Sequence, residues 1–160
     1  MTDLLPLLLG VSAIGAAVAG GVFFAFSGFV MQGLDRLSAS EAARAMRAIN
    51  VTAERPPLMI ELFGTALVSV VVAVMALVRG SDAAWWTCAA AAVYLVAVIG
   101  VTATANVPRN NALAAAAEHP DALASAWNAY HPGWTRWNHV RAVGGIVAAA
   151  LFLVALAIAV

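Results

Sequence analysis

Four stretches of the sequence are long and apolar enough to cross a membrane, and this limits the fold more than any other feature. They run from about residue 4 to 31, 57 to 78, 83 to 105 and 134 to 160. A helix needs about 20 mostly apolar residues to span a bilayer. Helices are expected because lipid offers unpaired backbone groups no partners, and the period-2 alternation of a barrel is absent. The sequence predicts an all-α, integral membrane four-helix bundle, with residues 1–160 forming one four-span domain.

The composition excludes the main alternatives to a membrane protein. Charged residues make up 10% of the chain and hydrophobic residues 64%, whereas soluble domains average about 25% charged residues. Eight basic residues balance eight acidic ones, so bulk charge does not predict nucleic-acid binding. The apolar content excludes disorder. The one cysteine, Cys88, cannot form an internal disulfide and fits no multi-cysteine metal motif.

The arginines predict the orientation. All eight basic residues are arginines, and only Arg79 lies outside the two long connections and their immediate neighbourhood. Short loops rich in basic residues stay in the cytoplasm. We therefore expect a multi-pass protein of the cell's inner (plasma) membrane, with both long connections in the cytoplasm and both termini outside.

Both long connections are predicted to contain short helices. A capping box over Ser38–Glu41 begins a helix at about 39–53, which is either an amphipathic helix at the membrane surface or a plain connector. In the second connection, Pro108 is expected to end the third span and Pro120 to begin a further helix. Pro132–Gly133 is expected to interrupt the chain before the fourth span.

The densest polar and aromatic stretch begins the fourth span. On a helix, Trp134, Asn138 and Arg141 fall within a narrow arc, which small residues continue. An interfacial belt of tryptophan and arginine is one interpretation, because such belts are common at helix ends. A site is the other, because Arg141 on a small-residue face needs a partner such as Glu61, Glu54 or a ligand oxygen. The position of Arg141 favours the site.

Three further groups are candidates for a site. Glu61 is an intramembrane carboxylate, which suggests function, although the dipole at a helix start also favours an acid there. Asn106, Asn110 and Asn111 either clamp a ligand through their amides or cap the helices around Pro108. Phe26 belongs to a phenylalanine cluster that either faces lipid or forms a wall for a flat apolar ligand.

The histidines do not form a metal motif. Only His139 lies in a span, so a bis-histidine haem inside the bundle lacks ligands. His119 and His131 lie in the second connection, and no histidine pair has the i,i+4 spacing typical of zinc sites. We predict no metal and no cofactor, although a histidine site in the loops stays open.

Five segments of the chain form a combination that matches a known pattern. They are Gly21–Ser27, Val30–Leu34, Ala45–Asn50, Asn106–Leu113 and Trp134–Arg141. Together they resemble the anthrone oxygenase-like family of small four-helix membrane proteins, over nearly the whole chain. One departure follows the third segment, where the family tends to continue with a basic residue and an Asn-Pro step. This chain reads Val-Thr-Ala-Glu-Arg-Pro-Pro at that point.

The resemblance implies an oxygenase. A few members of that family oxidise an anthrone to an anthraquinone with molecular oxygen and no firmly established cofactor. In such a reaction His139 or Glu61 would remove a proton from an electron-rich phenolic carbon acid, although Glu61 is not carried over from the family. Asn138, Arg141 and Asn106 would then stabilise the enolate oxygen.

The same resemblance implies an aromatic-lined pocket for an apolar small molecule or lipid-like ligand. Trp134, Trp137 and Phe26 would stack on a flat ring, and Asn50 and Asn111 are further binding candidates. A non-catalytic membrane module that binds a lipid, a quinone or a partner protein is the main alternative. A transporter is less favoured because four spans are few and no repeat is visible, although homo-oligomerisation through small residues would partly restore it.

Overall fold

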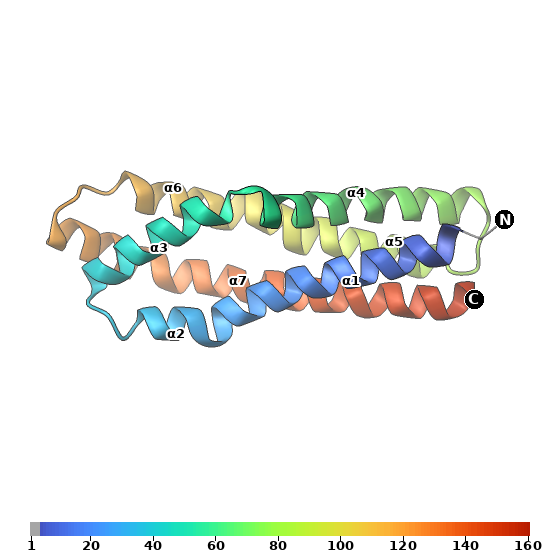
Figure 1. Cartoon of the computed structure of the whole chain (residues 1–160), viewed down its shortest axis with the longest axis horizontal. Coiled ribbons are helices and arrows are strands. Elements are labelled where there is room, and N and C mark those ends of the chain that lie inside the picture. The colour runs from blue at the N-terminus through green and yellow to red at the C-terminus, as the bar shows by residue number, and fades with distance from the viewer. Residues whose placement is uncertain (1–3) are drawn as a thin grey trace.

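The computed structural model describes residues 4–160, and its regular secondary structure there is entirely helical (Figure 1). In chain order the elements are α1 (Leu4–Ala25), η1 (Phe26–Val30), α2 (Met31–Leu34), α3 (Ala39–Ala53), α4 (Pro56–Val78), α5 (Ala84–Val93), η2 (Tyr94–Gly100), η3 (Thr102–Asn106), α6 (Val107–Ala115) and α7 (Pro120–Ala159). The three η elements are π-helical turns within long helices. Four continuous helices within the described residues are long and apolar enough to span a membrane: Leu4–Leu34, Pro56–Val78, Ala84–Ala115 and Pro120–Ala159. The protein is therefore a multi-pass membrane protein.

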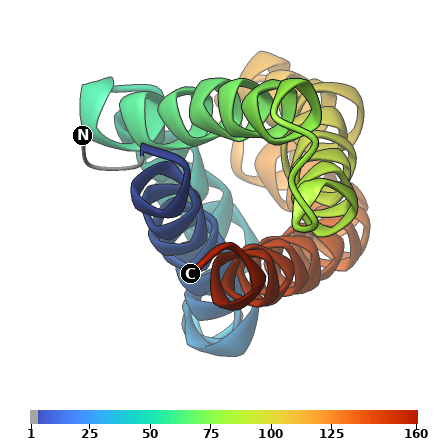
Figure 2. The same cartoon turned by 90° about the vertical axis from the view of Figure 1, so that its right-hand side faces the viewer.

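The four long helices form a square bundle when viewed along the axis (Figure 2). α1 lies beside α4 and α7, and α5 lies beside the same two helices. The contact of α1 with α7 is close because glycines meet there: a Cβ added to Gly145 would lie 2.7 Å from the Gly20 Cα. This arrangement confirms the predicted four-helix bundle and the small-residue face of the fourth span.

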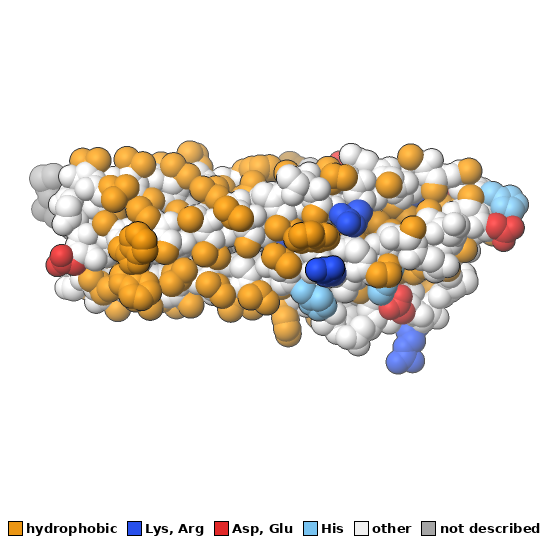
Figure 3. Space-filling model, turned by 180° about the vertical axis from the view of Figure 1, so that it is seen from behind, with side chains coloured by type: hydrophobic (Ala, Val, Ile, Leu, Met, Phe, Trp, Pro, Cys, Tyr) orange, Lys and Arg blue, Asp and Glu red, His pale blue; other side chains and the backbone are white. Residues whose placement is uncertain are grey.

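Two apolar cores follow one another along the bundle. The core of the membrane half lies between α1, α4, α5–η2 and the second half of α7, and includes Leu9, Val72, Tyr94 and Phe152. The second core lies between α2, α3, α6 and the first half of α7, and we call this region the cap. Its buried residues are Met31, Leu34, Ala42, Ala43, Met46, Leu113, Leu123, Trp127, Tyr130 and Trp134. Figure 3 shows a mostly hydrophobic surface over the membrane half, with most charges and histidines over the cap.

The cap exists because the helices are longer than a bilayer requires. The 40 residues of α7 span about 60 Å at the usual helical rise, whereas the hydrocarbon core is about 30 Å thick. α3 joins the cap as the predicted helix of the first connection. Its capping box is confirmed: the Glu41 amide donates to Ser38 Oγ, and the Ser38 amide donates to Glu41 Oε2.

The predicted proline breaks in the second connection are wrong. Pro108 lies in the first turn of α6, which continues directly from η3, and the Arg109 side chain donates to the Ala105 carbonyl there (2.7 Å). Pro132 lies inside α7, although an interior proline costs about 3 kcal/mol. Packing of α7 against α1, α3, α5 and α6 offsets that cost. The second connection therefore forms helix, as predicted, but as extensions of the long helices, and Pro120 begins α7 as expected.

Candidate functional site

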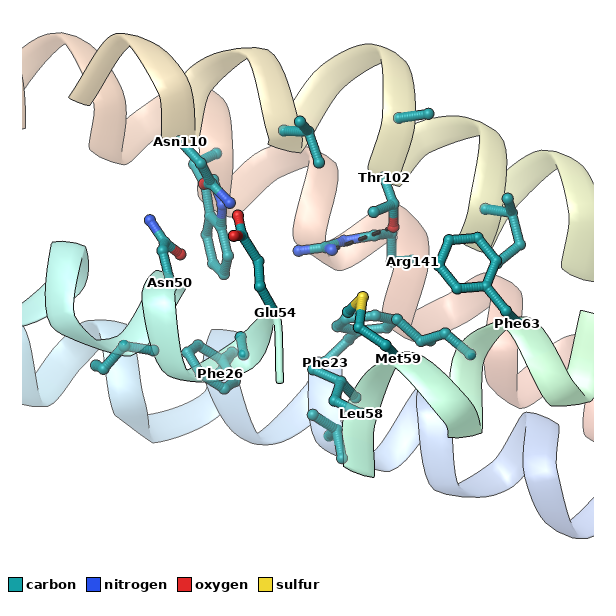
Figure 4. Close-up of a pocket in the computed structure, with 18 of the residues that line it drawn as sticks. Phe23, Phe26, Asn50, Glu54, Leu58, Met59, Phe63, Thr102, Asn110 and Arg141 are labelled. Atoms are coloured by element: carbon teal, nitrogen blue, oxygen red, sulfur yellow. Dashed lines mark hydrogen bonds between the residues drawn. The ribbon is translucent and has the colours of Figure 1, made fainter. Parts of the chain in front are cut away.

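A cavity of about 340 Å³ lies where the membrane half meets the cap (Figure 4). This volume is in the range of small-molecule sites. α1 and η1, α3, α4, the η2–η3–α6 segment and α7 all contribute to its wall. The lining residues are Val22, Phe23, Phe26, Met46, Ile49, Asn50, Ala53, Glu54, Leu58, Met59, Leu62, Phe63, Ile99, Thr102, Ala103, Val107, Asn110, Trp134 and Arg141. Most of them are apolar, so the few polar groups define where a ligand could form hydrogen bonds.

Arg141 is the buried cation of this cavity. Its side chain is only 5% exposed, and Nη1 donates to Thr102 Oγ1 (3.3 Å). The guanidinium carbon lies 4.1 Å from the Phe23 ring centroid and 5.3 Å from that of Trp134, which is favourable for a cation. Within residues 4–160 no carboxylate forms an ion pair with it. A buried charge without a counter-ion is costly, so the site is suited to an oxygen atom carrying negative charge.

Asn138 fixes the orientation of Arg141. Its side-chain oxygen accepts a hydrogen bond from Arg141 Nη2 (2.7 Å). Its Nδ2 donates to the Phe23 carbonyl (2.7 Å) and to Ser27 Oγ (2.6 Å). Ser27 lies in η1, and π-helical turns are frequent at functional sites because they redirect backbone and side-chain groups. Asn138 is fully buried and does not line the cavity itself, so it acts by positioning the guanidinium.

Another π-helical segment, η3, supplies the part of the cavity wall that contacts Arg141 from the third span. Thr102 begins this segment and accepts the hydrogen bond from Arg141 while its own hydroxyl donates to the Val98 carbonyl (2.7 Å). Asn106 ends the segment, and its Nδ2 donates to the Trp134 carbonyl (3.2 Å). Asn106 is buried but does not line the cavity. Its contact joins η3 to α7, so Asn106 supports the wall and is not in contact with the cavity.

The end of the cavity nearest the cap is polar. Figure 4 shows the Glu54 carboxylate pointing into the cavity, with Asn50 and Asn110 on one side and Arg141 on the other. The Tyr130 hydroxyl donates to Asn110 Oδ1 (3.0 Å) and holds that amide in place. Hydrogen-bond acceptors therefore face a fixed donor, Arg141, across an apolar space.

The predicted site residues divide into three groups: those that line the cavity, those that contact its wall from behind, and those that do neither. Phe26, Asn50, Trp134 and Arg141 line the cavity, and Phe26 and Trp134 form an aromatic contact with ring centroids 5.9 Å apart. Asn138 and Asn106 contact residues of this wall. The other four do not line the cavity: His139 and Asn111 are exposed on helix surfaces, Trp137 is partly exposed, and Glu61 is half-buried elsewhere.

Glu61 lies in a separate environment of the membrane half. Its Oε1 accepts a hydrogen bond from Thr65 Oγ1 (3.2 Å), and its Oε2 is buried without a partner in the described chain. Thr65 itself lies against Gly15 of α1. The Glu61 carboxylate therefore belongs to α4 near its contact with α1, and not to the cavity wall.

The sequence placed Asn110 only within the group of three asparagines that either clamp a ligand or cap helices, and it named Glu54 only as a partner for Arg141. Helical spacing was the available signal, because Asn110 follows Asn106 by four residues and Glu54 follows Asn50 by four. No group of three or more His, Cys, Asp or Glu side chains in residues 4–160 is arranged to hold a metal ion. His131 instead lies 3.2 Å from an Asp35 oxygen.

Comparison with known proteins identifies a family. The family model described as anthrone oxygenase matches residues 58–151, which is more than half of the chain. No curated protein and no solved structure matches the chain. The matched region runs from α4 into the second half of α7, and so contains Thr102, Asn106, Asn138 and Arg141. The chain belongs to the anthrone oxygenase family.

Proposed function

We propose that this protein is a membrane oxygenase that oxidises a flat, apolar, anthrone- or phenol-like substrate with molecular oxygen. One observation carries the proposal: within residues 4–160, Arg141 is buried without a carboxylate partner and faces an apolar, aromatic-lined cavity. The family match supports the reaction class. The Phe26 and Trp134 rings offer faces for a planar ligand, and such rings contribute strongly to binding of flat molecules.

Arg141 would act on the charge that develops when the substrate loses a proton. Removing a proton from the ring carbon opposite a carbonyl leaves an enolate, whose negative charge lies mainly on oxygen. A preorganised cation in a water-poor site stabilises such an oxygen strongly. Asn138 and Thr102 hold the guanidinium before the substrate arrives, so little reorganisation is needed during the reaction.

Molecular oxygen is the oxidant in the following step. The enolate gives one electron to oxygen, which forms a substrate radical and superoxide. These combine into a C–O bond, and a proton completes the hydroperoxide. Loss of the second proton from the same carbon then breaks the O–O bond, which leaves a carbonyl and releases water. One substrate and one oxygen molecule thus give one quinone and one water.

Glu54 is the proton acceptor that we favour over His139 and Glu61. Among residues 4–160 it is the carboxylate that lines the cavity, and a general base has to come within hydrogen-bond reach of its proton. His139 and Glu61 do not line the cavity. Oxygen uptake by Glu54→Gln, His139→Ala and Glu61→Gln separates the three, and we expect the first to lose the most.

Arg141 provides the main test. We expect Arg141→Met to lower oxygen uptake with anthrone by about 10²–10³-fold, the usual effect of removing a donor that stabilises an oxyanion. Arg141→Lys should recover little of this, because lysine keeps the charge but not the planar fork that Asn138 and Thr102 hold. Uptake is measured with an oxygen electrode on protein in lipid nanodiscs. Arg136→Met is the matched control, since Arg136 is exposed on the same helix.

Two results would contradict the proposal. Arg141→Met with wild-type uptake would remove the cation from the reaction. Saturable anthrone binding by the wild type without any oxygen uptake would instead indicate the non-catalytic binding module. Mass spectrometry of molecules that copurify with the protein would then identify a lipid or quinone ligand.

We also propose that the cap lies in the cytoplasm and that both termini face the other side of the inner membrane. Arg36, Arg44, Arg47 and Arg109 belong to the cap or its connections, whereas Arg79 lies at the opposite end of the bundle. The positive-inside rule supports this orientation. Labelling of single cysteines introduced at Arg36 and Ser81 into a Cys88→Ala background in intact cells tests it, since only the second should react with an impermeant reagent.

A further inference from the structure

Four residues of the cavity wall are also exposed on the outer surface: Glu54 at the end nearest the cap, and three apolar residues. Phe63 of α4 is 58% exposed and Val107 at the start of α6 is 39% exposed. Ala103 of η3 is exposed as well. A side chain that faces a cavity and the outside together marks the rim of an opening. The cavity therefore opens sideways, between α4 and the η3–α6 segment.

Helix contacts frame this opening on both sides along the bundle axis. Towards the membrane half, α4 packs against η2, and towards the cap, α3 packs against α6. Between these two contacts the wall consists of the π-helical segment η3 and the first turns of α4. We call the opening framed by Phe63, Ala103 and Val107 the lateral window.

The depth of the lateral window follows from the arginines beside it. Two helices border the window, and each has an arginine towards the cap: Arg55 at the start of α4 and Arg109 in α6. Arginine commonly marks the headgroup level. Phe63 comes eight residues after Arg55, which is about 12 Å along a helix. Ala103 comes six residues before Arg109, which is about 9 Å. The edge of the window at Phe63 and Ala103 therefore lies below the headgroups, within the hydrocarbon region, and Val107 lies nearer the headgroup level.

The surface around the window is suited to lipid. Ile60 and Leu67, the neighbours of Phe63 along α4, are 70% and 66% exposed. Val96, one to two turns before Ala103, is 70% exposed. Exposed apolar side chains on both sides of the opening place acyl chains and not water against its rim.

We propose that the cavity takes its ligand directly from the bilayer through the lateral window, and that the ligand is a planar apolar molecule with a hydrogen-bonding oxygen. This inference rests on the proposed function for the choice of ligand class. An apolar molecule concentrates in the hydrocarbon phase because its transfer from water is favourable. The ligand would pass between Phe63 and Ala103 with its rings against the apolar wall. Its oxygen would then reach Arg141 inside the cavity.

Plugging the window tests the route without any turnover. The probe is anthrone, added under argon to protein in nanodiscs, and stopped-flow quenching of tryptophan fluorescence follows its binding. We expect Ala103→Phe to slow association and dissociation alike, by about tenfold for a modest steric barrier. Both rates should fall by similar factors, so the Kd, which is their ratio, should change less than either rate does. Val96→Phe, which also introduces a phenylalanine but on lipid-facing surface outside the cavity wall, should bind at the wild-type rates.

A second variant approaches the window from α4. Phe63→Trp narrows the opening from the other side, and Leu67→Trp is its lipid-facing control. Wild-type rates in both plugged variants would overturn the proposal, and so would the absence of saturable quenching in the wild type. Because binding is measured without oxygen, a failure of the oxygenase reaction leaves these rates measurable, and the two proposals fail separately.

Discussion

Different physical effects stabilise the packing inside the membrane half and the packing inside the cap. In the membrane half, helices approach closely through small residues: Gly144 lies directly against Ala97, and Gly145 lies against Gly20. Lipid tails are as apolar as the helices, so shape complementarity and not the hydrophobic effect favours association there. The cap instead buries large side chains such as Trp127, which the hydrophobic effect drives out of water.

The candidate site lies at the boundary between these two regions, and each supplies a different part of it. The membrane half provides a water-poor wall with Phe23 and Leu62, whereas the cap provides Asn50 and Glu54. A buried cation requires polar partners near by, and an apolar ligand requires a path from lipid. The boundary is the part of the bundle where both conditions are met.

Removing a large side chain from the cap should have the greatest effect on stability. Trp127 is 4% exposed and stacks on Tyr130 with ring centroids 5.8 Å apart. We expect Trp127→Ala to lower the free energy of unfolding by about 3–5 kcal/mol, as for other buried aromatic residues. Denaturant titration monitored by hydrogen exchange of α3 and α6 measures this.

Trp85→Ala is the matched control for that substitution. Trp85 is 78% exposed on the surface of the membrane half, so its removal leaves no internal cavity. Equal losses of stability in the two variants would contradict the comparison, because they would show that the cap core is no more tightly packed than the lipid-facing surface.

Adding a small group to the membrane half should have the next largest effect. A Cβ at Gly145 would lie 2.7 Å from the Gly20 backbone, which cannot move aside easily. We expect Gly145→Ala to cost about 1–3 kcal/mol through overpacking. At Gly21 the same methyl group would meet nothing within 4 Å. Thermal unfolding in a mild detergent should therefore separate Gly145→Ala from Gly21→Ala, and identical midpoints would argue against close α1–α7 packing.

Hydropathy and helical periodicity predict most of this fold. The four spans, the capping box at Ser38 and the inward face of α7 are local properties of the sequence, and all are confirmed. The predictions of helix breaks at Pro108 and Pro132 are wrong because tertiary packing outweighs the local preference of proline. The extent of the cap could not be predicted, since hydropathy identifies where a helix leaves the membrane but not whether it continues.

The site could be predicted only in part. Periodicity along α7 correctly groups Trp134, Asn138 and Arg141, because they share one helix face. It also shows that His139 lies about 100° from Asn138, but a single helix cannot reveal which of its sides faces a ligand. Glu54 follows directly after α3, whose position over the cavity depends on contacts distant in sequence. Such contacts are not encoded by local pattern.

The smallest expected effect on stability concerns the ion pairs that join α3 to the connection between α6 and α7. Arg44 Nε donates to Glu118 Oε1 (2.9 Å) and Arg47 Nη1 to Glu118 Oε2 (2.7 Å), which joins α3 to the α6–α7 connection. The Arg44 hydrogen bond and the two nearby charges lower the pKa of Glu118 below its ordinary value. A lowered pKa in the folded state stabilises the cap above the unfolded-state pKa, and that stabilisation disappears as the pH falls through the folded-state value.

We therefore expect the cap to lose a small part of its stability below about pH 4–5, where an unpaired glutamate takes up its proton. The effect is small because the Glu118 side chain is 64% exposed and solvent screens such pairs. Thermal unfolding of Glu118→Gln should lack this component of the acid dependence, whereas Asp121→Asn, which changes an exposed neighbouring carboxylate, should retain it. An unchanged acid dependence in Glu118→Gln would mean that apolar packing alone stabilises the cap. The cap and the membrane half would then differ in the size of their buried side chains but not in their use of charge.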